Sequence, residues 1–325
     1  MQTMAARLIL GGLFSLALVS AANAQAYPSR PITTIIPFAG GSASDVVSRI
    51  MLERMSKSMG QPIIVENRPG AGGNSGTMAA ARAAADGYTL VGAGSGPIAA
   101  NITLYKHLGY DPYKELEIIS PFAGFTIVVV ASTNAKINSL KELVARAKAE
   151  PGKLNFGSVG IGSSQHLAGE HFAQVTGTKL THVPYRNIAQ YGPDLIAGTV
   201  PLGFQWFPNV SAPIQAGGAK VLAVAGDQRL AALPDAPTTA EAGLPEYKIS
   251  GWFALAAPGS TPRPILERLN KELTAALNDP AVREGFAKQG AAPITLSLDA
   301  AKKFHADEIV LYRNVITQAS IAQIE

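Results

Sequence analysis

The 325-residue sequence contains no cysteine. It therefore has no disulfide framework, no cysteine metal site and no thiol nucleophile. Charged residues are also scarce, at 15%, whereas hydrophobic residues make up 47%. A chain of this composition can bury a large core, and wholesale disorder is excluded. Its length is enough for two domains of ordinary size.

Dense runs of lysine and arginine are missing too. The net charge of +4 is spread thinly along the chain, which argues against nucleic acid as a partner while still drawing small anions modestly. Nucleotide signatures are absent: residues 70–75 fail the G-x-G-x-x-G pattern at Ser75, and no G-x-x-x-x-G-K-[ST] motif occurs. We therefore expect no cofactor.

No apolar run is long enough to span a membrane. The N-terminal run, residues 8–19, follows Arg7 and precedes small-x-small patterns at 22–24 and 24–26. Because a span needs about 20 apolar residues, this segment predicts a signal peptide, residues 1–25, rather than an anchor. We expect an exported, periplasmic protein.

Short β-branched runs alternate with helical patterns in the rest of the chain, which predicts an α/β fold with parallel strands. Strands are expected at residues 32–36, 63–65, 88–91, 126–131, 155–158, 182–185, 200–205, 220–225 and 252–257. Helices are expected at residues 45–59, 75–85, 139–149, 164–176 and 262–278.

This order of elements predicts two lobes. We assign residues 26–127 and 252–325 to lobe 1 and residues 128–251 to lobe 2. The chain would cross between the lobes twice, near residues 125–131 and 248–254. Two crossings make a hinge, and a hinge allows two lobes to close on a ligand.

Three glycine-rich loops, residues 37–45, 67–76 and 157–164, connect expected strands to expected helices. In open α/β sheets the ligand crevice lies at this edge, where helix N-termini present bare amides and partial positive charge. Any one of these loops could equally be an ordinary tight turn. Three at corresponding places favour an anion site.

Catalytic and metal motifs are not found. There is no G-x-S-x-G elbow, and His166 and His171 are five residues apart, which places them on different faces of a helix. His166 and Glu170 can share a face but make only part of a metal site. We expect neither a catalytic centre nor a metal.

The roles of two residues stay open from the sequence. Asp45 either organises its own loop or contacts the ligand. Trp206, with its aromatic neighbours, either forms a pocket wall or packs in the core.

Collinear sequence blocks carry a family resemblance over almost the whole mature chain. They include residues 27–32 (YPSRPI), 65–74 (VENRPGAGGN), 86–90 (DGYTL), 151–156 (PGKLNF), 182–186 (HVPYR), 237–245 (PTTAEAGLP) and 252–253 (WF). The chain resembles the tripartite tricarboxylate transporter receptors, also called Bug or TctC-like solute-binding proteins.

The resemblance implies a two-lobe periplasmic binding protein of the Venus-flytrap, type II-like class, monomeric, that delivers a small carboxylate to a permease with a large and a small membrane subunit. The ligand-binding residues that it implies are Phe38, Ala39, Gly41, Ser42, Asp45, Ala71, Gly72, Gly73, Asn74, Ser158, Ser163, Ser164, His166, Tyr185, Arg186 and Gln205.

Three positions depart from the family's usual pattern. Ser42 replaces the second glycine of the first loop, Asn187 replaces a glycine, and Gln205 stands where many members have an acid. An acid at that position suits a ligand's amino group, so Gln205 favours a mono- or dicarboxylate without an amino group.

Two alternatives remain open from the sequence. A periplasmic sensor would use the same closed state to signal to a membrane partner. A secreted hydrolase using Ser164 and His166 would need an acid partner and a nucleophile motif, and the sequence offers neither.

Overall fold

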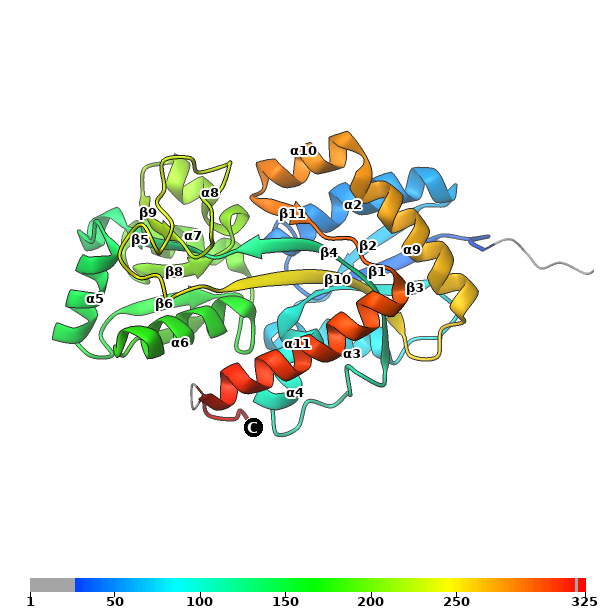
Figure 1. Ribbon diagram of the computed structural model, residues 1–325, viewed down its shortest axis with the longest axis horizontal. Helices are drawn as coiled ribbons and strands as arrows, with labels where there is room; N and C mark the ends of the chain where they lie inside the picture. Colours follow the sequence, from blue (N-terminus) through cyan, green and yellow to red (C-terminus); the bar gives the residue numbers. More distant parts are fainter. Residues whose placement is uncertain (1–26, 319–320) are drawn as a thin grey trace, which may run out of the picture.

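Two separate β-sheets organise the chain, and each is the centre of an α/β lobe (Figure 1). The computed structural model describes residues 27–318 and 321–325. The expected signal peptide, residues 1–25, lies outside the described residues. Within residues 27–318 and 321–325, no helix has the length and apolar character needed to cross a membrane.

The first lobe contains a six-stranded sheet in the order β11-β4-β10-β3-β1-β2. These strands are β1 (Ile32–Ile36), β2 (Ile63–Asn67), β3 (Thr89–Gly94), β4 (Leu116–Thr126), β10 (Ser250–Pro258) and β11 (Ala291–Pro293). β1 is parallel to β2 and β3, so their carboxyl ends share one edge. Because both faces of β1 are covered, its sequence ITTII is β-branched and apolar rather than alternating.

Helices cover both faces of this sheet (Figure 1). On one side lie α2 (Ala43–Met59), α9 (Arg263–Asn278) and α10 (Pro280–Lys288), which pack on one another. On the other side lie α3 (Asn74–Ala81), α4 (Asn101–Leu104) and the long α11 (Leu298–Gln318). A short π-helical turn, η2 (Gly96–Ala100), follows β3 and contacts α11.

The second lobe contains a five-stranded sheet in the order β7-β6-β8-β5-β9. These strands are β5 (Val128–Ser132), β6 (Asn155–Ser158), β7 (Thr181–Pro184), β8 (Leu202–Gln205) and β9 (Ala219–Val224). β6 is parallel to β7 and β8, so their carboxyl ends also share an edge. The helices of this lobe are α5 (Leu140–Ala149), α6 (Ser164–Thr176), α7 (Tyr191–Ala197) and α8 (Phe207–Gln215).

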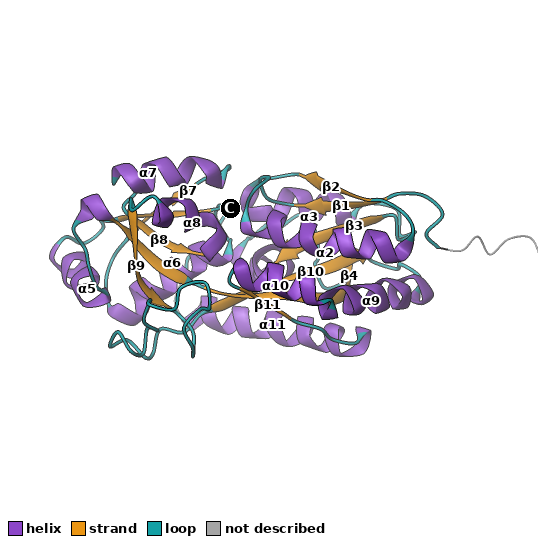
Figure 2. Cartoon of the chain, turned by 90° about the horizontal axis from the view of Figure 1, so that it is seen from above, coloured by secondary structure: helices purple, strands orange, loops and turns teal. Residues whose placement is uncertain are grey.

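Two neighbouring strands connect the lobes. β4 passes into β5 through the single residue Ile127, and the chain returns into β10 at Ser250, which pairs with Thr126. Figures 1 and 2 show β4 and β10 side by side between the lobes. Beyond this pair, the N–H of Ala225 donates to the carbonyl of Ile127 over 2.8 Å. The two crossings therefore form one hydrogen-bonded ribbon.

The expected strands at 32–36 and 155–158 and the expected helix at 164–176 are confirmed at the same bounds. The prediction of a single strand at 126–131 is wrong, because β4 ends at Thr126 and β5 begins at Val128. The helix expected at 75–85 begins at Asn74 and ends at Ala81, so its last turn is not helical. The elements that the sequence pattern does not predict include β4, α4, α7, α8, α10, β11 and α11.

Candidate ligand-binding site

Two helices from different lobes begin at the same place in the molecule. α2 follows the carboxyl end of β1, and Ser42 caps it by accepting the N–H of Asp45 over 3.4 Å. α6 follows the carboxyl end of β6, and Ser163 caps it by accepting the N–H of His166 over 3.3 Å. Each helix carries about half a positive charge at its N-terminus. The two ends therefore bring partial positive charge to one site from opposite sides.

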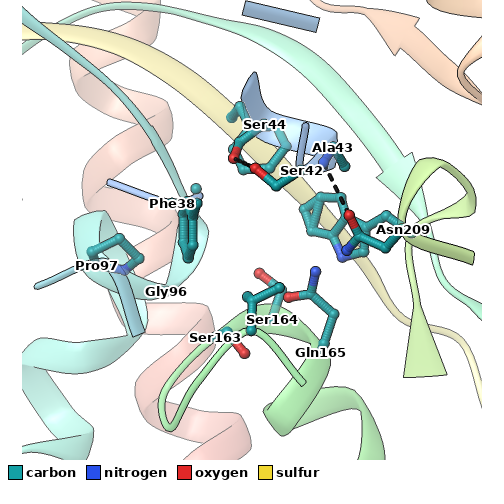
Figure 3. Close-up of a pocket in the computed structure, with 14 residues that line it drawn as sticks. Phe38, Ser42, Ala43, Ser44, Gly96, Pro97, Ser163, Ser164, Gln165 and Asn209 are labelled. Atoms are coloured by element: carbon teal, nitrogen blue, oxygen red, sulfur yellow. Dashed lines mark hydrogen bonds between the residues drawn. The ribbon is translucent and has the colours of Figure 1, made fainter. Parts of the chain in front are cut away.

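A narrow cavity lies between these helix ends (Figure 3). The space that no atom fills in and around it is about 310 Å³, including its opening to solvent. Both lobes supply its walls: Phe38, Ser42, Ala43, Ser44, Gly94, Gly96, Pro97 and Phe253 from the first, and Val159, Ser163, Ser164, Gln165, Trp206 and Asn209 from the second. Its lining includes no charged side chain and no histidine. Hydrogen-bonding groups there are backbone amides, hydroxyls and carboxamides, set among aromatic walls.

Several backbone N–H groups at the two helix ends are unpaired. The first N–H groups of a helix have no partner inside it. In the part of the chain that the structure describes, the N–H groups of Ser44, Ser164 and Gln165 have no hydrogen-bond acceptor. The N–H of Ala43 differs, because it donates to Oδ1 of Asn209 across the cleft over 3.0 Å. Unpaired amides at two helix N-termini make an anion-binding arrangement.

The lobes touch around this cavity, so the conformation is closed. The hydroxyl of Tyr105 donates to the carbonyl of Ile161 over 3.0 Å, joining the first lobe to the second. Gly72 approaches the same carbonyl so closely that a Cβ on Gly72 would lie 2.0 Å from the oxygen. Gly72 also has φ of +62°, a left-handed conformation that favours glycine. Closure therefore depends on a backbone-to-backbone contact.

A wider cavity continues from the narrow one toward solvent, with about 1240 Å³ of empty space including its open mouth. Phe38, Ser42 and Val159 line both spaces and mark the passage between them. Arg186 lines the wider cavity and is exposed. Among the described residues it has no ion-pair partner and no hydrogen bond from its side chain. It is a free cation at the mouth of the site.

The structure divides the sequence-predicted site residues into three groups. Four line the narrow cavity: Phe38, Ser42, Ser163 and Ser164. Five line only the wider cavity: Ala39, Ala71, Gly72, Tyr185 and Arg186. Seven line neither: Gly41, Asp45, Gly73, Asn74, Ser158, His166 and Gln205.

Asp45 organises its own loop rather than lining the cavity. Its carboxylate accepts the N–H of Gly41 over 2.9 Å, and its other oxygen accepts from Arg49 and Asn67, each over 2.9 Å. Burial alone would raise the pKa of Asp45, but these hydrogen bonds outweigh it and hold the pKa below its usual value. The carboxylate is thus a fixed anion that ties the first loop to α2 and β2.

Gln205, predicted as a ligand contact, lies behind the cavity wall in this structure. Its side chain is fully buried, Nε2 donates to the carbonyl of Gly157 over 2.8 Å, and Oε1 accepts from Nδ2 of Asn209 over 3.0 Å. Both ends of this carboxamide are therefore already paired within the protein. Gln205 orients Asn209, and Asn209 in turn faces the cavity.

His166 also lies behind the cavity wall. Nδ1 accepts the N–H of Gly162 over 3.2 Å, and its ring lies 4.2 Å from the ring of His182 between centroids. Burial lowers the pKa of His166 to about 4 and, together with the charge of His166, lowers that of His182 to about 3. Both rings are therefore neutral near pH 7.

The same geometry gives Ser164 no catalytic base. Its Oγ lies 2.9 Å from Oγ of Ser95 and has no hydrogen bond to His166 among the described residues. Nor do residues 27–318 and 321–325 contain a group of three or more histidines or acids that could hold a metal. A serine hydroxyl paired only with another hydroxyl is not an activated nucleophile.

Sequence reasoning missed several residues of the narrow cavity. Gln165 lies between the predicted ligand-binding residues Ser164 and His166, and its position in the first turn of α6 is a signal for a ligand contact. Gly96 and Pro97 follow the carboxyl end of β3, the same sheet edge as the first loop. Asn209 is the third residue of α8, and no motif marks it.

Comparisons with known proteins decide the family. A family model described as "Tripartite tricarboxylate transporter family receptor" matches residues 47–321. The chain belongs to this receptor family. The predicted family and the predicted two-lobe α/β Venus-flytrap fold are therefore confirmed, and the family is one of solute receptors rather than enzymes.

Individual relatives of this receptor match over nearly their whole length. BugT from Bordetella pertussis is 37% identical over 297 residues, covering 91% of each chain. The structure titled "periplasmic binding protein BugD" superposes with a TM-score of 0.86 at 31% identity, covering 92% of this chain and 100% of BugD. Rpa4515 from R. palustris, solved with adipate, gives 0.87 at 31% identity with the same coverage.

Proposed function

We propose that this receptor captures a small organic acid in the periplasm and presents it to a permease with a large and a small membrane subunit. The observation that carries the proposal is the narrow cavity between the N-termini of α2 and α6. Two helix ends with unpaired amides suit one carboxylate, because two half-charges balance a single negative charge. The adipate in Rpa4515 and the periplasmic description of BugD agree with this assignment.

The ligand is an acid without an amino group. A buried ammonium would need an acidic partner, and no aspartate or glutamate lines either the narrow or the wider cavity. The aromatic and proline side chains that wall the narrow cavity, including Phe38, Phe253 and Pro97, suit a short apolar carbon skeleton.

Closure of the two lobes is the functional motion in this proposal. We take lobe 1 to be residues 26–127 and 252–325 and lobe 2 to be residues 128–251, acting as one monomer. The positions of the two sheets and of the β4–β10 ribbon support these boundaries. A ligand that contacts both helix ends stabilises the closed form, which is the form that a permease would recognise. The contact residues carried over from the family remain part of the proposal where they line a cavity.

A ligand screen tests the proposal. The mature protein is unfolded, freed of carried ligand and refolded, and its thermal midpoint is measured with mono-, di- and tricarboxylates, aromatic acids and amino acids. At 100 times its Kd, a ligand adds about 2.7 kcal/mol to the free energy of unfolding, which is easily seen. We expect stabilisation by at least one acid, recovered unchanged. No stabilisation by any acid, or recovery of a hydrolysed product, would overturn the proposal.

A further inference from the structure

The side chain of Gln165 has no partner. The residue is 4% exposed and lines the narrow cavity from the first turn of α6. Figure 3 shows its carboxamide pointing away from α6 into the space below Ser42, Ala43 and Asn209. In the part of the chain that the structure describes, neither its oxygen nor its nitrogen has a hydrogen bond to protein. The two atoms are not enclosed by protein, so the carboxamide faces the open space of the cavity. A ligand that fills this space would enclose the carboxamide, and an enclosed polar group without a partner is destabilising.

Trp206 provides a second unpaired group in the same wall. It is 1% exposed, and its Nε1 is buried with no acceptor among the described residues. The neighbouring Asn209 differs, because its oxygen accepts from Ala43 and its nitrogen donates to Gln205. The indole N–H is enclosed in the wall, so the carboxamide of Gln165 is the side-chain group here that offers the cavity both an unpaired donor and an unpaired acceptor, beside the free amides of α6.

The chemistry of these groups restricts what can satisfy them. A carboxamide has an acceptor oxygen and two N–H donors, and an indole N–H only donates. An alkyl chain pairs with none of them, and a carboxylate accepts from the donors but leaves the oxygen of Gln165 facing another negative oxygen. A hydroxyl group both donates to that oxygen and accepts from an N–H. The helix ends already provide for the carboxylate.

We propose that Gln165 is a specificity-determining residue and that the ligand is a small hydroxy acid, whose hydroxyl pairs with the Gln165 carboxamide while its carboxylate lies at the helix ends. This inference rests on the proposed function and narrows it from organic acids in general to acids with a hydroxyl group. The plain acid of the same length is discriminated against, because it would bury the carboxamide unpaired.

Matched ligand pairs test the assignment. Affinities are measured by calorimetry for lactate and propionate, 3-hydroxybutyrate and butyrate, and malate and succinate, using both enantiomers of each hydroxy acid. For wild type we expect at least one hydroxy acid to bind about tenfold to a hundredfold more tightly than its partner, the range associated with one unsatisfied buried polar group. Gln165→Leu, which has a similar volume and no polar atom, should reduce that preference to within about threefold while preserving affinity for the plain acid.

Two further variants keep the test decisive. Gln228→Leu, at an exposed position of the second lobe, controls for the effect of the substitution itself and should retain the wild-type preference. Gln165→Met replaces Gln165→Leu if the leucine variant does not fold, as judged by its thermal midpoint without ligand.

The outcomes separate the two proposals. Binding of acids by wild type without preference for the hydroxyl overturns this inference and leaves the proposed function standing. An equal loss of both members of a pair in Gln165→Leu also overturns it, because a merely structural role would have that effect. Failure of every acid to bind wild type overturns the proposed function and this inference together.

Discussion

Ser95 and Ser164 are joined across the cleft by a buried hydrogen bond between their hydroxyl oxygens, 2.9 Å apart. Ser95 belongs to the first lobe and follows β3, whereas Ser164 begins α6 in the second. Tyr312 of α11 donates to Ser95 over 2.9 Å, so three hydroxyls form one buried chain. The closed cleft is therefore linked to the long C-terminal helix.

Ser95→Ala should weaken ligand binding without unfolding the protein. The substitution removes a hydrogen bond that joins the two lobes in the closed form, and such a bond contributes about 1 kcal/mol. We expect affinity to fall about fivefold, mainly through faster dissociation, as measured by stopped-flow fluorescence. Tyr312→Phe is the matched control because it keeps the Ser95–Ser164 bond. Equal effects of the two substitutions would contradict the cross-lobe role.

Gly72→Ala should prevent closure. A Cβ on Gly72 would lie 2.0 Å from the carbonyl oxygen of Ile161 in the other lobe. Gly60 is the control, because it has a similar φ of +70° but nothing within 4 Å of an added Cβ. We expect Gly60→Ala to cost about 1 kcal/mol of stability with unchanged affinity. Gly72→Ala should lose affinity at least about a hundredfold, and small-angle scattering should show an open form even with ligand present. A closed Gly72→Ala protein with normal affinity would refute the contact.

Asp45→Asn should disturb the first loop rather than remove a ligand contact. The carboxylate accepts from Gly41, Arg49 and Asn67, and its pKa is held below the usual value. Hydrogen bonds to a charged group contribute about 1.5–3 kcal/mol, so a loss of about 2 kcal/mol in the free energy of unfolding is expected from urea titration. Glu53→Gln, an exposed acid on the same helix, should change stability by less than about 0.5 kcal/mol.

The pair His166 and His182 should make stability fall in acid. Burial holds the pKa of His166 at about 4 and that of His182 at about 3, both below the 6.5 of an unfolded histidine. The unfolded chain therefore binds more protons between about pH 6.5 and 3, so the free energy of unfolding decreases as the pH drops through this window. The shift of His166 alone corresponds to roughly 3 kcal/mol.

Substitution of His166 measures that contribution. Burial raises the pKa of the neighbouring Glu170, whose Oε1 lies 3.8 Å from Nε2 of His166, and this acts in the opposite direction. Urea titrations at pH 7 and pH 4.5 should show a smaller stability difference for His166→Gln than for wild type. His107→Gln, at an exposed position, should behave like wild type. An unchanged difference in His166→Gln would show that the pair does not control acid stability.

Much of the fold follows from local pattern. The strand at Ile32–Ile36 is a β-branched run, and the helix at Ser164–Thr176 lies between the N-cap Ser163 and the C-cap Gly177. These local signals predict the bounds of both elements. β4 was not anticipated because its sequence LEIISPFAGFT contains Pro121 and Gly124, which normally weaken a strand. Its pairing with β10 provides the stability that its own sequence does not indicate.

The site was harder to predict, because its residues come together only when two lobes close. Glycine-rich loops pointed to Ser42, Ser163 and Ser164, since helix ends can be read from spacing. Gln205 lies behind the cavity because its carboxamide donates to the carbonyl of Gly157 in the neighbouring strand β6, and it holds Asn209 through its oxygen. Gly157 and Gln205 are far apart in sequence. Sequence spacing carries no such information.

The paired crossings of β4 and β10 limit how the lobes can move. A ribbon of two hydrogen-bonded strands can bend and twist, whereas sliding one strand along the other would break pairs such as Ser250 with Thr126. The lobes can therefore change the angle between them while the register of the ribbon is kept. Each cycle of opening and closing returns Ser44 and Gln165 to the same facing positions, so a membrane partner that docks on the closed receptor meets one reproducible outline.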